Sequence, residues 1–556
     1  MLSFNTDPTQ ADHEMEAVLF YLAAFGYIDG HFDKSEREYV DDFILELSEA
    51  LEPDDSDSAG RARRAALVDR LDRKLQRIDA ELKGMWDEPT AEGERAQSFV
   101  RARMKLRCFE TFEYFSLKDR KTLMDAVDKM LVADGVAHPE EVQFRDELMA
   151  LVTGKRSAAP PPHVGPSGTR VVIHPHAEWP PTGANDESLA ALERHYSKHP
   201  DVFKRQLNAD VERMDKFIRV LEAKRSTHAG TLAGYQTVQE LAGRGSFLDG
   251  HVHVIAPTHP AGYELTVLGD LHGCYSCLKA ALMQSDFINK VERFTNAPQS
   301  HPEPLLVFLG DYIDRGLYSF QGVLRAVLEL ATTMPRHVIV LRGNHEYYLE
   351  KDGQVYGGVR PANALDDLQP YAPVEIFQSY MRLFEAMPNM LLFDDILMVH
   401  AGIPRDATLR QHYKDLSSLN HPDIRFQMMW SDPSSVDVVP DDLQASTNRF
   451  SFGYEQARAF LHRMGIQTLI RGHEKVNDGF IANYDEPDLR VLTLFSAGGA
   501  NNSDLPERSS YRKVTPSAMT IRYRTGRADI EPWVIDYASY NDPALNEFFN
   551  DDPDLD

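Results

Sequence analysis

Five short motifs between residues 269 and 474 carry side chains that can bind metal ions. Each motif places a carboxylate, imidazole or carboxamide next to a glycine, directly after a short apolar run. They read Gly-Asp-Leu-His-Gly (269–273), Gly-Asp-Tyr-Ile-Asp-Arg-Gly (310–316), Gly-Asn-His-Glu (343–346), Val-His-Ala-Gly (399–402) and Arg-Gly-His-Glu (471–474). Apolar runs that end at glycine predict buried strands that stop at tight turns. Because ligands collect at the carboxyl ends of strands in an α/β sheet, we expect one shared site.

The ligand types in these motifs suit a pair of divalent cations. Two such ions, roughly 3.5–4 Å apart, can hold both the attacking and the leaving oxygen of a phosphoester and acidify a bridging water. Asp311 is the natural bridging carboxylate between them. Because no cysteine is among the ligands, a structural zinc site is disfavoured, and manganese, iron or zinc in a catalytic role is favoured. The candidate ligands are Asp270, His272, Asp311, Asn344, His400 and His473.

The same motifs contain candidates for proton transfer and phosphate binding. His345 could protonate the leaving oxygen, with Asp314 orienting the ring and raising its basicity. Arg315 offers a fork of donors for phosphate oxygens, and Arg449 is a candidate for a second grip. For three neighbouring residues, structural ion pairing is at least as good an interpretation as catalysis: Glu346, Arg471 and Glu474.

Four further motifs extend the pattern over roughly residues 250 to 500. They are Phe-Glu-Ala-Met-Pro (384–388), Trp-Ser-Asp-Pro (430–433), Asn-Arg-Phe-Ser-Phe-Gly (448–453) and Thr-Leu-Phe-Ser-Ala (493–497). With the metal motifs, they resemble the PPP family of metal-dependent serine/threonine protein phosphatases, within the calcineurin-like metallophosphoesterases. The resemblance implies an α/β sandwich of two mixed sheets flanked by helices.

The resemblance also implies roles for individual residues. It places Asp270, His272 and Asp311 on one metal, and Asp311, Asn344, His400 and His473 on the other. It makes His345 and Asp314 the acid dyad, and Arg315 and Arg449 the phosphate clamps. These assignments agree with those argued from the residues themselves.

Two segments depart from the family pattern. Family members usually continue after residue 497 with Pro-Asn-Tyr, whereas this chain reads Gly-Gly-Ala-Asn-Asn (498–502). We therefore expect a more flexible loop that lacks an aromatic wall over the site, which leaves substrate specificity open. The stretch 347–371 is either a specificity loop or a surface insertion without a role.

Composition shifts divide the chain into five parts. We expect an all-α domain over 1–153, a Pro/Gly-rich linker over 154–185 and a helical connector over 186–245. The connector either enters the catalytic domain or links the two parts as a hairpin. The catalytic domain follows over 246–536, and an acidic tail over 537–556 is expected to be disordered.

The first domain resembles the TerB-like helical domain in a short repeated pattern. An apolar helix ends at Asp-Gly, and a new helix begins with an acidic first turn, near residues 27–36 and again near 132–141. The functional interpretation is a metal-sensing module or one that binds an unknown protein partner. The alternative is that its acidic residues are helix caps and turn residues: Asp29, Glu36, Asp134 and Glu141.

Two smaller patterns receive structural interpretations. The alternation in 251–255 predicts a strand that pairs with 263–268 across a Pro/Gly turn, with His251 and His253 facing outward. Cys274 and Cys277 form a Cys-x-x-Cys pair in an expected helix, where packing is the default interpretation.

Charge and length limit the classes of partner. The net charge of −27 over 556 residues argues against binding nucleic acid or an anionic membrane surface. A locally positive pocket would still accept a phosphoprotein, best with basic residues around its phosphosite. Neither a secretory signal nor a membrane-length apolar run is visible, so we expect a cytoplasmic protein.

The leading hypothesis is an enzyme that dephosphorylates phosphoserine and phosphothreonine, by attack of a metal-bridging hydroxide with His345 as general acid. A second hypothesis keeps this chemistry for a dinucleoside polyphosphate or another small phosphoester. A third, a non-catalytic scaffold that merely binds phosphate, is disfavoured because no ligand or acid is missing from the motifs.

Overall fold

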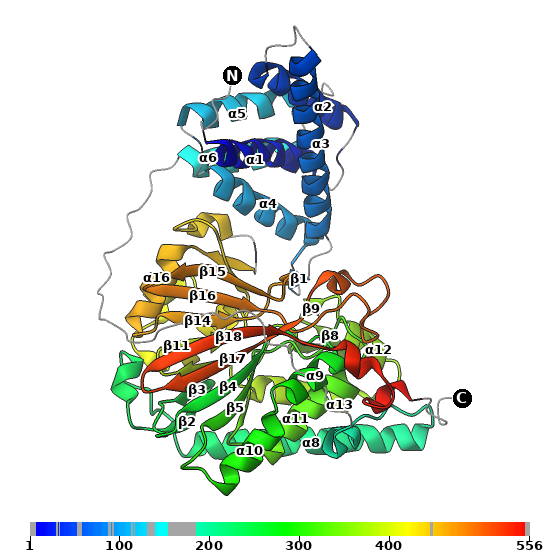
Figure 1. Ribbon diagram of the computed structural model, residues 1–556, viewed down its shortest axis with the longest axis vertical. Coiled ribbons are helices and arrows are strands. Elements are labelled where there is room, and N and C mark those ends of the chain that lie inside the picture. Colours follow the sequence, from blue (N-terminus) through cyan, green and yellow to red (C-terminus); the bar gives the residue numbers. More distant parts are fainter. Residues whose placement is uncertain are drawn as a thin grey trace. The chain divides into compact units, whose positions relative to one another are not determined.

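The chain forms two compact units, seen in a computed structural model (Figure 1). One unit comprises Met1–Pro160 with Ser434–Arg449, and the other comprises Pro161–Pro433 with Phe450–Asp556. The structure describes residues 7–153, with gaps at 29–31, 33, 53–57, 87–89, 92–93, 113–114, 116 and 131–138, and residues 185–550 except 445, 446 and 448. Each unit is described by itself below.

The first unit is helical, as the sequence predicts. Its central helix α1 (Pro8–Gly26) is buried along most of its length because the run from Val18 to Phe25 is apolar on every face. Around it lie α2 (Lys34–Leu51), α3 (Ser58–Trp86), α4 (Ala96–Phe112), α5 (Leu117–Met130) and α6 (Pro139–Thr153), with a two-residue strand β1 (Thr90–Ala91). Asp29 and Asp134 of the TerB-like pattern, and residues 154–184 of the expected linker, lie outside the described residues. The likeness to TerB therefore stays a prediction.

The segment 434–449 groups with the helical unit, although the sequence places it inside the catalytic domain. It leaves β12 (Ser431–Pro433), contains the short helix η4 (Asp441–Gln444) and returns at β13 (Phe450–Phe452). Within the first unit, the apolar side chains of Val436, Val439 and Leu443 pack with Leu106 and Phe109 of α4.

Two mixed sheets form the centre of the second unit, which confirms the expected sandwich. One sheet has the order β18-β17-β4-β5-β6 and the other the order β15-β16-β14-β11-β10-β3-β2. The first contains β4 (Tyr263–Leu268), β5 (Glu303–Phe308), β6 (Val338–Val340), β17 (Ser517–Arg524) and β18 (Arg527–Val534). The second contains β2 (Ser246–Asp249), β3 (Val252–Ile255), β10 (Met390–Phe393), β11 (Ile396–Val399), β14 (Thr468–Arg471), β15 (Phe480–Glu486) and β16 (Leu489–Leu494).

The core of the sandwich comes from side chains on the facing surfaces of both sheets. Leu265 and Val267 of β4 share one buried cluster with Ile396 and Met398 of β11. Because β4, β5 and β6 are parallel neighbours, helices must cross over between them. These crossovers are α9 (Tyr275–Gln284) and α10 (Phe287–Asn296), then the π-helical turn η2 (Ser319–Leu324) with α11 (Arg325–Thr333).

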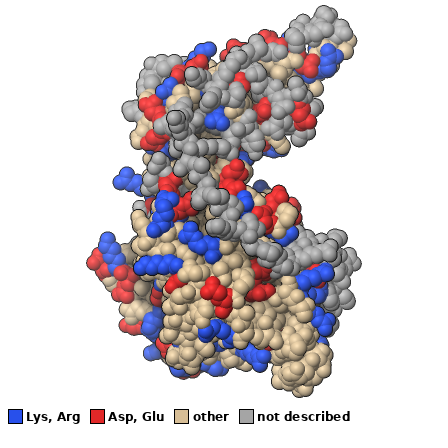
Figure 2. Space-filling model, turned by 90° about the vertical axis from the view of Figure 1, so that its left-hand side faces the viewer, with Lys and Arg blue, Asp and Glu red and all other residues tan. Residues whose placement is uncertain are grey.

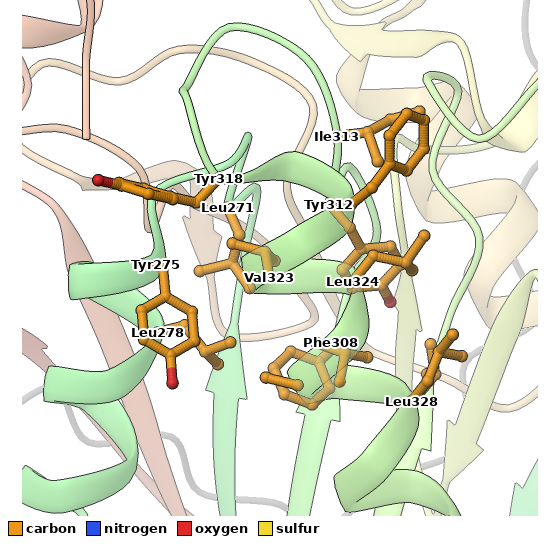
Figure 3. Close-up of a cluster of buried hydrophobic side chains, with 14 of the residues drawn as sticks. Leu271, Tyr275, Leu278, Phe308, Tyr312, Ile313, Tyr318, Val323, Leu324 and Leu328 are labelled. Atoms are coloured by element: carbon orange, nitrogen blue, oxygen red, sulfur yellow. The ribbon is translucent and has the colours of Figure 1, made fainter. Parts of the chain in front are cut away.

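Helices cover the outer face of the five-stranded sheet. Figure 3 shows Tyr275 and Leu278 of α9 and Leu328 of α11 in one buried cluster with Phe308 at the end of β5. The helices α7 (Glu187–Ala190), α8 (Pro200–Ser226) and α13 (Val374–Ala386) belong to the same buried cluster. The residues of the expected connector belong to the second unit. The remaining elements are α12 (Asn363–Leu368), α14 (Asp406–His412), α15 (Pro422–Met428), α16 (Tyr454–Arg463), β7 (Tyr348–Lys351), β8 (Gln354–Gly357), β9 (Val359–Arg360) and 3-10 turns η1 (Val238–Leu241), η3 (Leu416–Asn420), η5 (Ser510–Lys513), η6 (Ala538–Asn541) and η7 (Glu547–Phe549).

Two expectations about strands are wrong. The strand β3 does not pair with β4, because it lies between β2 and β10 in the other sheet. With neighbours on both edges and helices over its face, β3 is buried at every residue, and the His253 side chain points inward rather than outward. Alternation in the sequence predicts one buried face, so it could not reveal that both faces of β3 are covered.

The acidic tail is ordered further than the sequence predicts. Phe548 and Tyr540 are buried, and Asn546 donates to the Tyr540 carbonyl. The apolar residues spaced through the segment explain this order, because their side chains pack into the buried cluster of the second unit. The last six residues, 551–556, lie outside the described part.

Acidic and basic side chains are interspersed among the described residues on the face shown in Figure 2. None of the helices in the described ranges is both long and apolar enough to cross a membrane.

Candidate metal-dependent active site

The five metal motifs follow five strands, three in one sheet and two in the other. They come directly after β4, β5, β6, β11 and β14, as the apolar runs predict. The motifs need their glycines because carboxylate oxygens approach the glycine backbone too closely for a side chain. A Cβ at Gly343 would lie 2.2 Å from Asp311 Oδ1, and one at Gly472 would lie 2.3 Å from Asp270 Oδ1. Non-glycine residues with left-handed backbone cluster here, as at functional sites elsewhere: His272, Asp311, Asp314, Arg315 and His473.

Asp270, His272 and Asp311 converge on one point. The Nε2 atom of His272 lies 3.7 Å from Asp270 Oδ2 and 3.4 Å from Asp311 Oδ2. The Nδ1 atom of His272 lies 2.8 Å from the Ile313 carbonyl oxygen and donates to it, which leaves the lone pair on Nε2 facing the carboxylates. All three side chains are buried. This is the orientation that a metal ligand requires.

Asn344, His400 and His473 converge on the other side of Asp311. The Nε2 atom of His400 lies 3.4 Å from Asp311 Oδ1, 2.8 Å from the Asn344 carboxamide and 3.2 Å from His473 Nδ1. The Leu309 carbonyl, 3.2 Å from His400 Nδ1, holds this ring with Nε2 inward. Asp311 therefore lies between both groups, as the sequence predicts for a bridging ligand.

The donor set fits divalent cations on two observations. Asp270 Oδ2 is buried and makes no hydrogen bond within the described part of the chain. The Asn344 carboxamide lies 3.2 Å from both Asp311 oxygens. If the carboxamide oxygen is the atom turned toward them, it faces only hydrogen-bond acceptors, an arrangement that a cation between these atoms would make favourable. Carboxylate, carboxamide and imidazole ligands together suit manganese, iron or zinc.

Burial decides the protonation of these groups. It raises the pKa of Asp270 to about 8 and raises that of Asp311 well above its usual range. It lowers the pKa of His272, His345 and His400, with help from nearby Arg315 or Arg471. Neutral imidazoles beside buried carboxyl groups form a site that positive charge would stabilise.

The proposed acid dyad has hydrogen-bonding geometry. His345 Nδ1 lies 2.6 Å from Asp314 Oδ2, and the other oxygen of Asp314 accepts from the Ala364 backbone at 2.8 Å. The Nε2 atom of His345 lies 3.9 Å from Asp311 Oδ2, so this edge of the ring faces the Asp311 carboxylate. The stretch 347–371 thus contacts the site through Ala364, which favours a role for it there.

The two arginines have different positions. Arg315 lies beside the dyad, with Nη1 3.5 Å from the Pro361 carbonyl and Nη2 buried without a hydrogen bond among the described residues. Arg449 belongs to the first unit, with the segment 434–449. Its role as a second phosphate ligand stays a prediction.

Two buried residues hold the motifs in place. Glu346 is fully buried and accepts from the backbone N–H groups of Asp311, Tyr312 and Gly343 at 2.8–3.0 Å. Arg471 is also fully buried, and it pairs with Asp432 and Glu474 and donates to the Ala401 carbonyl. Glu346 and Arg471 therefore fix the loops that carry the candidate ligands, which favours the structural interpretation of these two residues.

Tyr511 is a site residue that the sequence analysis missed. Its ring centroid lies 5.4 Å from that of His272 and 5.3 Å from that of Phe495. Arg315, Asp270 and Asp311 all influence its pKa, which burial raises. The expected absence of an aromatic wall is wrong, because a tyrosine from η5 supplies one from a different point in the chain.

The expected flexibility of loop 498–502 is also wrong. Gly498 and Gly499 have φ of 155° and 118°, and a Cβ at Gly499 would lie 2.3 Å from the Tyr537 ring. Asn502 is fully buried and donates to the Gly498 carbonyl at 2.7 Å. The glycines thus permit tight packing rather than movement.

Comparison with known proteins assigns the family of this region. Residues 263–477 match the calcineurin-like phosphoesterase family. They form a calcineurin-like metallophosphoesterase domain. A probable serine/threonine-protein phosphatase of Encephalitozoon cuniculi is 26% identical over 259 residues, 46% of this chain and 51% of that protein. Serine/threonine-protein phosphatase PP1-1 of Saccharomyces cerevisiae is 28% identical over 242 residues, 43% of this chain and 70% of that protein.

The metallophosphoesterase domain also resembles solved structures at low identity. A Saccharomyces cerevisiae serine/threonine phosphatase with similarity to human PP5 gives a TM-score of 0.36 at 18% identity, covering 57% of this chain and 89% of that one. A cold-active protein-tyrosine phosphatase of Shewanella gives 0.31 at 16%, covering 50% and 82%. The chain spans about half the length of the Encephalitozoon relative. The match to the calcineurin-like phosphoesterase family implies divalent metals.

Proposed function

We propose that the second unit is a phosphoprotein phosphatase that hydrolyses phosphoserine and phosphothreonine with two divalent metal ions, manganese foremost. The observation that carries the proposal is the convergence of two ligand groups on Asp311, next to a hydrogen-bonded His345–Asp314 dyad. The names of the two relatives, both serine/threonine-protein phosphatases, support the substrate class. Divalent cations in this donor set would supply Lewis acidity at the phosphoryl group and an acidic water.

The residues of the chain have separate tasks in this proposal. Asp270, His272 and Asp311 would hold one ion, and Asp311, Asn344, His400 and His473 the other. Arg315 offers its buried Nη2 to a phosphoryl oxygen, and Arg449 is the candidate for a second contact. Asp314 holds His345 Nδ1, so Nε2 can give a proton to the leaving oxygen.

The direct test is hydrolysis by chelator-stripped protein after manganese is added back. A phosphothreonine peptide and a dinucleoside polyphosphate would be compared in parallel. Metal-dependent turnover of the peptide is expected, and selective cleavage of the dinucleotide would overturn the substrate class but keep the site. Asp311→Asn should abolish turnover and lower metal content. Asp201→Asn is its matched control, because Asp201 is exposed in the first turn of α8 and belongs to none of the motifs.

The acid role of His345 predicts a dependence on the leaving group. His345→Ala should reduce kcat on a phosphothreonine peptide by about 10²–10⁴-fold, the range for a lost general acid. An aryl phosphate should lose much less, because its leaving group departs as a stable anion without a proton. Equal losses on both substrates would contradict the assignment and indicate a purely structural role.

A further inference from the structure

A hollow lies at the end of the five-stranded sheet that is opposite the metal motifs. Three of those motifs follow the carboxyl ends of β4, β5 and β6, whereas the hollow lies at the start of β4 and at the turn between β17 and β18 (Figure 1). Its volume is about 240 Å³. Charged side chains from three strands line it: Glu264, Arg522, Arg524, Arg527 and Asp529.

Two of these arginines face each other across the hairpin turn. The turn consists of Thr525 and Gly526, both with left-handed backbone (φ 48° and 75°). Arg524 and Arg527 flank it and are directly opposite in the strand register. Side chains that are directly opposite lie on the same face of a sheet, where like charges are destabilising. This pair costs the hairpin stability, so its charges point to a role other than holding the turn.

The acidic side chains on this face are already paired, and one guanidinium has no acidic partner. The pairs are Arg527–Asp529, Arg522–Glu531 and Lys290–Glu264. Arg524 makes no hydrogen bond or ion pair within the described part of the chain. Among the described residues, this face therefore keeps one uncompensated positive charge, although the whole chain carries a net charge of −27.

Both guanidinium groups of the opposed pair are available to a ligand. Arg524 and Arg527 are exposed. Arg527 uses Nε and Nη2 to donate to one oxygen of Asp529, at 3.0 and 2.8 Å, and its Nη1 atom has no partner in the described ranges. The strand that carries Arg524 pairs with β4 on one edge and with β18 on the other, so the backbone of the site is fixed before a ligand binds.

We propose that this hollow binds an acidic residue of a partner polypeptide, whose carboxylate accepts hydrogen bonds from Arg524 and Arg527. A carboxylate between two guanidinium groups replaces their repulsion by attraction, and its two oxygens match the planar fork of arginine. One carboxylate also neutralises the single uncompensated charge. A phosphate group would bring up to two negative charges close to the acidic side chains of the same face. The volume is below the roughly 300–1,000 Å³ of small-molecule sites, which favours a single side chain as the occupant.

The test is the binding of a fluorescein-labelled oligoglutamate to the full chain, measured by fluorescence polarisation at physiological salt and without divalent metal. Salt screens the net negative charge of the chain, and the absence of metal keeps the peptide from binding through ions at the candidate active site. Saturable binding to the wild type is expected. Arg524→Glu should weaken it by about tenfold or more, because a hydrogen bond between charged groups is lost and a repulsion is added.

Two further variants separate the arginine fork from charge alone. Arg524→Lys keeps the charge without the fork and should bind with intermediate affinity. Arg219→Glu makes the same change of charge on an exposed position of α8 and should bind like the wild type. Arg524→Glu places opposite charges across the turn, so its thermal midpoint should equal or exceed that of the wild type, which excludes misfolding as the cause of lost binding.

Either of two results overturns the proposal: no saturable binding to the wild type, or equal affinities in Arg524→Glu and Arg219→Glu. Stronger competition by a phosphoserine peptide than by unlabelled oligoglutamate would also overturn it, because phosphate would then be the preferred group. Since binding is measured without metal, these outcomes are independent of the proposed phosphatase activity.

Discussion

Tyr511 shows how a single side chain can complete a site from an unexpected position. It lies against His272, which it packs in place, and close to Arg315. The Tyr511 side chain at this position can both line the site and orient the Arg315 guanidinium. Tyr511 is a positioning residue, because its contacts are with groups that would touch the substrate.

This position predicts a split between binding and turnover. Tyr511→Ala should raise KM for a phosphothreonine peptide several-fold, since an aromatic wall is lost, and should lower kcat less. Tyr511→Phe keeps the ring and serves as the matched variant, so it should retain most of the wild-type KM. Loss of kcat alone in Tyr511→Ala, with KM unchanged, would contradict the role.

Among individual residues, the sequence indicates the candidate ligands that lie next to a glycine after an apolar run. It does not indicate the residues whose contacts depend on the path of a loop. Asp270 and His473 follow apolar runs and are visible in the sequence. Tyr511 has no such signal, because its contacts with His272 and Phe495 are made only when η5 packs beside the loops that carry them. Asp432 belongs to the Trp-Ser-Asp-Pro motif, but its ion pair with Arg471 could be recognised only from the folded structure.

At the scale of elements, strand β3 carries a histidine whose burial has a thermodynamic consequence. Burial lowers the pKa of His253 to about 3, with the positive charge of Lys224 acting in the same direction. The ring is neutral in the folded state and regains a proton when the chain unfolds. Because the folded pKa is depressed, stability is full above the unfolded pKa of about 6.5 and is lost as the pH falls below it.

The expected size of this effect can be measured against a neutral variant. When the pH is lowered from 7 to 5, protonation of His253 in the unfolded chain should reduce the free energy of unfolding by about 2 kcal/mol. His253→Gln should lose less stability than the wild type over the same interval, because glutamine does not titrate. Denaturant unfolding at both pH values gives the comparison, and parallel losses in the two proteins would contradict the assignment.

The strands themselves were predictable, whereas their partners were not. Each apolar run before a metal motif is a strand, because length and terminal glycine are local signals. The pairing of β3 with β10 joins residues far apart in the sequence, and no local pattern encodes it. The same holds for the segment 434–449, whose apolar residues pack with α4 in the helical unit.

At the scale of the whole chain, the second unit is closed by its own C-terminal segment. Phe548 packs against Tyr275, Tyr318 and His195. The backbone of Glu547 donates to Glu193, which also pairs with the buried Lys279. The segment thus joins the entry helices to α9, the helix that follows the first metal motif.

This closure predicts that a residue far from the chemistry governs the thermal stability of the catalytic unit. Phe548→Ala removes a buried ring from between three aromatic neighbours and should cost about 3–5 kcal/mol of the free energy of unfolding. Loss of phosphatase activity on heating is the appropriate measurement, because it reports on the second unit alone, and its midpoint should fall by several degrees. Tyr371→Ala is the matched control, since Tyr371 is 76% exposed and its removal should leave the midpoint unchanged. An unchanged midpoint in Phe548→Ala would mean that the segment lies on the unit without stabilising it.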